Sequence, residues 1–258
     1  MRATPFFACL LACYLVIGCG DDESDSSPSD ASKAGSGGSA QLRDVPCTDQ
    51  SVSALVLFDT PNKAAIKDEL HDGDTFESVI DATGGGLTPT QGFVYARFTD
   101  DGLRRVDLSD EQAFRSLDWD IAFRRYVIRL NSGVSGPGDV RGARTRPDSD
   151  FDSVTELTDD LNFRSEEYFT ESCDFVNDSS GLPGGPGTAL ASFWSYPGCV
   201  SMTHNVYVVE LTRPKKRHVK LEVQAYYSLA AQRACDATGS VPTPSGAGTL
   251  RVKWAFID

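Results

Sequence analysis

Alternating apolar and polar side chains predict β-strands over much of the second half of the chain. The two kinds of residue alternate through 219–227 and through 250–256, which is the period that turns one face of a strand toward a core. Residues 206–211, VYVVEL, form a β-branched run typical of a more buried strand. Residues 93–99 predict a further strand. Pro214 indicates a hairpin turn between the strand at 206–211 and the strand that begins near residue 217.

One short helix is predicted outside these strands. Thr60 is a suitable helix cap, Pro61 suits the first helical turn, and residues 62–70 would continue the helix. No internal repeat of about 20–50 residues is visible. Residues 45–258 are therefore expected to form a single β domain, a length that is ordinary for one all-β unit.

The apolar pattern changes phase inside residues 116–136. Apolar side chains stand at odd positions before Arg124 and Arg125 and at even positions after them: Trp119, Ile121 and Phe123, then Tyr126, Ile128 and Leu130. A β-bulge at one of the arginines would keep these residues on one face and redirect one guanidinium. Asp118 and Asp120 are expected to pair with it, because an unpaired buried arginine costs several kcal/mol. The plainer alternative is a structural strand with a paired arginine.

The N-terminus has the features of an export signal. Residues 1–18 combine a basic start with an apolar run at 6–17, shorter than the roughly 20 residues that span a bilayer. The sequence Val-Ile-Gly-Cys ending at Cys19 resembles a bacterial lipobox, in which the cysteine is lipidated and becomes the new N-terminus. Each buried acyl CH₂ would contribute about 0.8 kcal/mol of membrane attachment. An ordinary signal peptide with an incidental cysteine is the alternative.

Residues 19–44 are predicted to be the lipidated N-terminus followed by a disordered tether. They contain almost no large apolar side chain and start with an acidic run, Asp21 to Glu23. Such a segment cannot bury enough surface to offset the entropy of ordering.

Charge and motifs restrict the classes of function. The formal net charge is −13, so a nucleic acid, whose backbone is also negative, is not expected as a partner. The sequence has no G-x-S-x-G, no H-E-x-x-H and no phosphate-binding glycine loop followed by Lys-Ser/Thr. We therefore predict that the protein is not an enzyme.

Cysteine usage predicts two disulfides. Removal of the leader and lipidation of Cys19 would leave four cysteines in an exported chain: Cys47, Cys173, Cys199 and Cys235. Spacing permits three pairings, of which we favour Cys173–Cys199, closing the glycine-rich loop 181–187, together with Cys47–Cys235. Each would stabilise the fold by about 2–4 kcal/mol. A zinc site is disfavoured, because the chain has no C-x-x-C pair.

Residues 119–138, WDIAFRRYVIRLNSGVSGPG, resemble the hallmark segment of the HmuY family, haem-binding lipoproteins of Gram-negative bacteria. The family pattern is Trp-Asp, an apolar residue, Ala, an apolar residue, His or Arg, Arg and an aromatic residue, then a basic strand and Asn-x-Gly-x-Ser-Gly. The matching residues include Trp119, Asp120, Ala122, Arg125, Tyr126, Arg129, Asn131, Gly133 and Gly136. Residues 93–106 and 205–228 resemble flanking family segments, so the likeness covers about residues 75–258.

The resemblance implies an all-β fold of antiparallel sheet with few short helices, and a role in haem capture outside the cell. It also implies an outer-membrane lipoprotein, exposed at the cell surface, that meets haem, haem-carrying proteins or a TonB-type receptor. Family members hold haem iron with two histidines, or with methionines in related types. This chain departs from that pattern: Arg124 stands where several relatives carry His, and the corresponding ligand loop near 193–198 contains no histidine.

Met202 and His204 are the candidate haem ligands that remain. They are two residues apart and would share one face of a strand, and thioether and imidazole are both haem axial ligands. Tyr196 and Trp194 would stack on the porphyrin. The structural alternative places Met202 in the core and His204 at the surface. If haem ligation has been lost, the scaffold would bind a glycan, peptide or partner protein, with an exposed aromatic patch at Phe193, Trp194 and Tyr196.

Overall fold

The computed structural model describes residues 42–257 except 87, 181, 183 and 184, without the side chains of 70–72. The predicted signal peptide 1–18, the anchor Cys19 and the tether up to residue 41 lie outside the described residues. Within the described part of the chain, no helix is both long and apolar enough to cross a membrane.

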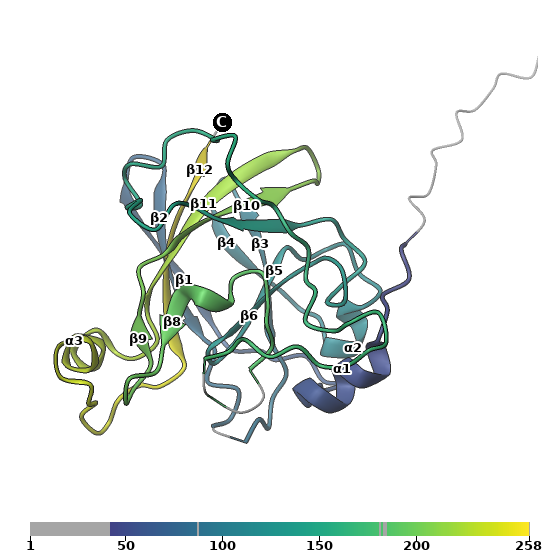
Figure 1. Cartoon of the computed structure of the whole chain (residues 1–258), viewed down its shortest axis with the longest axis horizontal. Helices are drawn as coiled ribbons and strands as arrows, with labels where there is room; N and C mark the ends of the chain where they lie inside the picture. The colour runs from purple at the N-terminus through teal and green to yellow at the C-terminus, as the bar shows by residue number, and fades with distance from the viewer. Residues whose placement is uncertain (1–41, 87, 181, 183–184, 258) are drawn as a thin grey trace, which may run out of the picture. The chain divides into compact units, whose positions relative to one another are not determined.

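Antiparallel strands in two larger sheets and one small hairpin form the framework (Figure 1). The six-stranded sheet has, in order, β1 (Ile66–Asp72), β2 (Thr75–Asp81), β12 (Thr249–Ile257), β11 (Arg217–Ala225), β10 (Val206–Leu211) and β7 (Arg141–Arg144). The four-stranded sheet has β4 (Gly102–Val106), β3 (Val94–Thr99), β5 (Ile121–Arg124) and β6 (Val127–Leu130). The hairpin is β8 (Trp194–Ser195) with β9 (Ser201–Met202). The prediction of an all-β, antiparallel fold is confirmed.

The helices of the described chain are short. They are α1 (Thr48–Leu55), α2 (Asp110–Ala113), α3 (Leu229–Thr238) and the 3₁₀ turn η1 (Ala191–Phe193). The Ser228 side chain accepts a hydrogen bond from the Ala231 N–H at the start of α3, and Gly239 ends the helix in the left-handed conformation. No helix was predicted at these residues from the sequence.

The helix predicted after Thr60 is wrong. Residues 61–65 are irregular, and β1 follows from Ile66. Pairing with β2 outweighs the local helix signals, because Ile66 to Leu70 and Asp72 each gain a ladder partner there. The Asp68 carboxylate adds tertiary bonds, accepting from the Ser78 hydroxyl at 2.5 Å and the Leu103 N–H at 3.0 Å.

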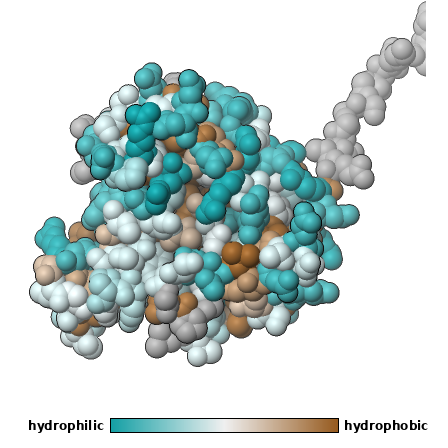
Figure 2. Space-filling view, viewed as in Figure 1, coloured by the Kyte–Doolittle hydropathy of each residue, from teal (hydrophilic) through white to brown (hydrophobic). Residues whose placement is uncertain are grey.

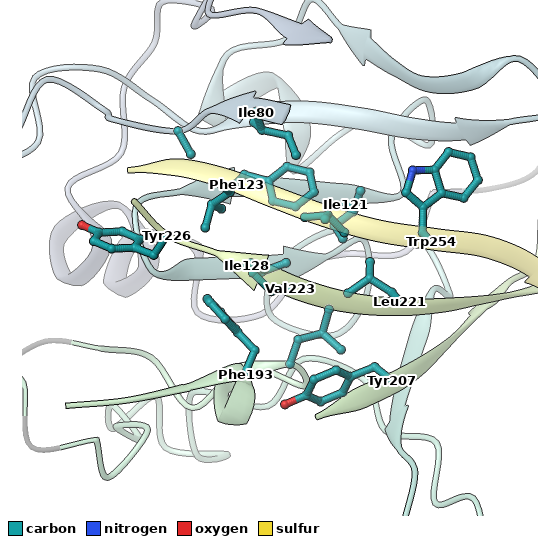
Figure 3. Packing of buried hydrophobic residues seen from close by; sticks show 14 of the residues in the cluster. Ile80, Ile121, Phe123, Ile128, Phe193, Tyr207, Leu221, Val223, Tyr226 and Trp254 are labelled. Atoms are coloured by element: carbon teal, nitrogen blue, oxygen red, sulfur yellow. The ribbon is translucent and has the colours of Figure 1, made fainter. Parts of the chain in front are cut away.

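The main core lies between the two larger sheets (Figure 3). Ile80, Leu221 and Trp254 face inward from the six-stranded sheet and meet Ile121 and Phe123 of the four-stranded sheet, and all five are fully buried. The opposite face of the four-stranded sheet is buried too, in a second cluster of Phe93, Tyr95, Ala113, Trp119 and Ala122. Both faces of β5 are therefore covered.

A hairpin, not a bulge, explains the phase change at the two arginines. Strand β5 pairs antiparallel with β6, and Arg124 lies opposite Val127, which leaves Arg125 and Tyr126 as a two-residue turn. Directly opposed residues such as Phe123 and Ile128 share one face of the sheet. Because every opposed pair joins an odd to an even position, the apolar residues must change parity at the turn. The predicted bulge is wrong. The continuous apolar face is confirmed for Ile121, Phe123, Ile128 and Leu130, with Tyr126 packed against it, but Trp119 lies in the cluster on the other face.

The predicted carboxylate partners of the arginines are also wrong. Arg124 donates to the carbonyl oxygens of Leu55 and Val56 at the end of α1, the latter at 2.9 Å. Helix C-termini leave such carbonyls without partners, so the guanidinium acts as their cap. Its carbon lies 4.2 Å from the centre of the Phe93 ring. Asp120 instead accepts from the Phe98 N–H at 3.0 Å, inside the four-stranded sheet.

Two disulfides form as predicted in number, but the favoured pairing is wrong. The bonds are Cys47–Cys173 and Cys199–Cys235. Cys199 lies in the loop of the β8–β9 hairpin, which packs on α3, where Cys235 is buried. Cys47 directly precedes α1 and packs with the separate cluster that contains Tyr168 and Phe169. Neither neighbourhood can be read from cysteine spacing.

Candidate functional site

The candidate site lies at one end of the sheets, around the β8–β9 hairpin and the turn of the β5–β6 hairpin. The ring of Tyr126, in that turn, lies 5.0 Å from Trp194 of β8 and 6.3 Å from Tyr226, which follows β11. We call Tyr126, Trp194 and Tyr226 the aromatic cluster. In Figure 2 the surface over β8 and β9 has fewer strongly hydrophilic residues than the upper part of the molecule.

The β8–β9 hairpin is held firmly by α3 and by the chain before it. The Asp236 carboxylate accepts from the Ser201 hydroxyl at 2.8 Å and from the Met202 N–H at 3.2 Å. The Gln232 amide donates to the Val200 carbonyl at 3.0 Å, and the Cys199–Cys235 disulfide closes the same contact. The hairpin therefore presents its side chains from a fixed frame.

Glu166 secures the segment that leads into the hairpin. Its buried carboxylate accepts from the N–H of Leu130 at 2.8 Å and of Ala189 at 3.0 Å, which joins β6 to the residues before η1. Burial raises the pKa of Glu166 to about 7, although the two N–H donors and the charges of Arg129 and Arg164 oppose the rise. This link between distant segments was not predicted.

Met202 and His204 do not share a face. Strand β9 ends at Met202, whose side chain is buried in the main core. His204 has a φ of +55°, so the chain leaves the extended conformation on which the same-face prediction depended. The His204 side chain is 59% exposed. The arrangement matches the structural alternative for these two residues, and their role as haem ligands stays a prediction.

The His204 imidazole is anchored by a carboxylate. Its Nδ1 lies 2.8 Å from Oε1 of Glu222 in β11. This hydrogen bond raises the pKa of His204 above its usual value, against the effect of partial burial. The Nε2 atom makes no hydrogen bond within the described residues. An imidazole held through one nitrogen by a carboxylate, with the other nitrogen open, is the usual geometry of a metal-binding histidine.

The aromatic residues near the hairpin are mostly buried. Phe193 and Trp194 are 1% and 4% exposed, whereas Tyr196 is 47% exposed. The exposed aromatic patch predicted at these three residues is therefore wrong. Trp194 pairs with Met202, so His204 lies at the level of residue 192 in the hairpin. Tyr196 is four residues further along, which corresponds to a distance on the order of 13 Å. Tyr196 and His204 thus lie toward opposite ends of the hairpin.

The remaining described histidine has a structural environment. His218 Nε2 lies 3.3 Å from the buried Glu210 carboxylate, which also binds Lys216 at 2.6 Å and Arg141. Burial opposes ionisation of Glu210, but its bonds to Lys216 and Arg141 lower its pKa to about 2. Within the described part of the chain, no group of three or more His, Cys, Asp or Glu side chains is arranged to hold a metal ion.

A shallow cavity of about 580 Å³ lies apart from the aromatic cluster. It is lined by Phe58 and residues 60–64, which lead into β1, together with Asp81 and residues 90–92. Its volume is within the range of small-molecule sites, about 300–1,000 Å³. No binding role was predicted for these residues from the sequence.

Comparisons with known proteins identify the family. The family model described as HmuY protein matches residues 70–238, and no curated protein matches the chain. Among solved structures, an apo HmuY analogue of Tannerella forsythia matches with 14% identity and a TM-score of 0.39, covering 77% of this chain and 98% of that one. Because the family model spans well over half of the sequence, the chain belongs to the HmuY family.

Proposed function

We propose that this protein is an exported, non-enzymatic lipoprotein that captures haem or a related porphyrin, with His204 as the ligand from this chain. Family membership supports the cargo class, and the anchored imidazole supports the site. Attachment through Cys19 would place the domain at the outer membrane, exposed at the cell surface. Haem-carrying proteins and a TonB-type receptor would then be its partners.

The hydrogen bond between His204 Nδ1 and Glu222 is the main structural support for this function. Glu222 fixes the ring orientation and favours the proton on Nδ1, which leaves the Nε2 lone pair available to iron. The exposure of the ring lets a large planar ligand approach. Haem iron would supply the coordination bond when bound, and the protein supplies an oriented, electron-rich nitrogen.

His204 is the one candidate ligand of the pair that is accessible. The Met202 side chain is packed in the core, so its sulfur would reach iron only if the core opened. Tyr196 is exposed but lies toward the other end of the hairpin, where it would contact only an outer edge of the porphyrin. Haem binding through His204 therefore requires one protein ligand and no repacking of the core.

A haemin titration followed by absorption near the Soret region tests the proposal. We expect the wild-type chain to shift the band, and His204→Ala to weaken binding by about tenfold or more, roughly 1.4 kcal/mol. Met202→Leu and His218→Gln are the controls, because one keeps the core volume and the other removes a histidine engaged elsewhere. No spectral change in either redox state, or an unaltered His204→Ala variant, would contradict the proposal.

The second candidate is a recognition lipoprotein that binds a glycan, peptide or partner protein on the same scaffold. The cavity beside β1 favours it, because Lys63 and Gln91 place polar side chains on a lining that also includes Phe58. This function predicts indifference to haemin. It also predicts loss of ligand binding in Lys63→Ala but not in His204→Ala, measured by calorimetry with any glycan or peptide found to bind.

A further inference from the structure

Three buried polar groups without partners surround Tyr126. They are Nε of Arg125, Nε1 of Trp194 and the hydroxyl of Tyr226. The Arg125 guanidinium lies 5.7 Å from the centre of the Tyr226 ring and 6.0 Å from that of Tyr126. Figure 3 shows the Tyr226 hydroxyl directed away from the packed core residues. Buried polar groups are nearly always bonded, so a gathering of three is unusual.

These groups cannot satisfy one another fully. The Nε–H of Arg125 and the indole N–H of Trp194 are donors that accept nothing. Burial raises the pKa of Tyr226, although Arg125 opposes the rise, so the phenol keeps its proton and can donate as well. The Tyr226 oxygen can accept a hydrogen bond from Arg125, but a neutral phenol does not balance the charge of the guanidinium, so the cluster itself holds no negatively charged acceptor.

Charge indicates what kind of acceptor is needed. Arg125 makes no ion pair within the described residues, whereas most other buried or half-buried arginines of the four-stranded sheet contact an acceptor. Arg125 also has a φ of +52°, where glycine or asparagine is favoured. Its backbone N–H bonds to the Ala82 carbonyl, which holds the turn in place. An arginine in this costly position contributes through its side chain.

We propose that Arg125, Trp194 and Tyr226 bind a carboxylate carried by a planar aromatic ligand. The guanidinium supplies the charge, the indole N–H and the phenol supply directed bonds, and the Tyr126 ring offers a face for stacking. A porphyrin with its carboxylate side chains is one source, and in that form the inference rests on the proposed function. A smaller aromatic acid is the other source.

The tryptophan indole N–H signals provide an internal test by nuclear magnetic resonance of the ¹⁵N-labelled full chain. Trp119 donates to the Ala113 carbonyl at 3.1 Å and Trp254 to the Ser78 hydroxyl at 2.8 Å, so both are already bonded. We expect benzoate to move the Trp194 signal downfield and saturably, while the other two signals stay. Benzamide, without the charge, should have little effect. The Trp194→Phe variant assigns the signal.

Variants separate binding from structure. Arg125→Gln should abolish the benzoate response, Arg125→Lys should keep part of it, and Tyr226→Phe, which removes a hydroxyl that contacts Arg125, should weaken it. Arg213→Gln is the matched control, because Arg213 is exposed in the β10–β11 turn. An unmoved Trp194 signal, an equal response to benzamide, or an unaltered Arg125→Gln variant would overturn the proposal.

Protoporphyrin IX and its dimethyl ester, both free of metal, distinguish the two sources. If the porphyrin is the source, the wild type prefers the diacid by about tenfold, Arg125→Gln removes the preference, and His204→Ala leaves it unchanged. Equal binding of diacid and ester, with the benzoate response intact, assigns the site to a smaller acid. If the protein does not coordinate haem iron but still prefers the diacid to the ester, only the proposed function is refuted.

Discussion

Removal of the Cys199–Cys235 disulfide should weaken both the fold and the candidate site. The bond closes a sequence separation of 36 residues. The loop-entropy relation for a loop of this size gives a loss of about 3.8 kcal/mol in the free energy of unfolding at about 25 °C. The other disulfide, Cys47–Cys173, closes 126 residues, for which the same relation gives about 4.9 kcal/mol.

The two disulfides differ in what they hold. Cys199 belongs to the hairpin that leads to His204, whereas Cys47 and Cys173 lie with α1 and the Tyr168 cluster. Guanidinium unfolding of the two double serine variants should therefore show the larger loss for Cys47/Cys173. Haemin affinity, measured where each variant is folded, should fall only for Cys199/Cys235. Equal haemin affinities in both variants would contradict a role of the Cys199–Cys235 bond in holding the site. A larger stability loss for Cys199/Cys235 would contradict the dependence on loop length.

Three further results are expected. The free energy of unfolding should fall by roughly 3 kcal/mol as pH rises from about 4.5 to 7, because the pKa of Glu166 is raised in the folded state. Urea unfolding of Glu166→Gln should not show this dependence. A stability difference between wild type and variant that does not change with pH would contradict it. Glu222→Gln should weaken haemin binding at pH 8 by about 10–100-fold through loss of the anchored His204 ring, and unchanged affinity would count against that anchor. Tyr226→Phe should lower the free energy of unfolding by no more than about 1 kcal/mol, because the buried hydroxyl has at most a weak contact with the Arg125 guanidinium. A larger loss in thermal unfolding would show a strong bond there.

Much of the fold followed from local pattern. Side-chain alternation predicted the strands at 219–227 and 250–256, and a β-branched run predicted the strand at 206–211, which is buried throughout. The parity change at Arg124 and Arg125 was recognised, but its cause was assigned to a bulge. A hairpin with a two-residue turn gives the same pattern, and without the usual Asn-Gly signal the sequence offered no means of choosing.

The site depended on contacts between distant segments. Glu222 lies 18 residues from His204 and orients it only because β11 passes beside the end of β9. The aromatic cluster joins residues from three separate parts of the chain. The same-face prediction for Met202 and His204 assumed an extended strand, whereas a positive φ at His204 ends it. Such conformations at a residue other than glycine leave little trace in sequence.

The most direct measurement is an iron-anomalous difference map from crystals of the chain grown with haemin. We expect one iron peak beside His204 Nε2, with Met202 still packed in the core. An iron peak bound by other residues, or haemin bound with the His204 ring unengaged, would contradict His204 as the haem ligand.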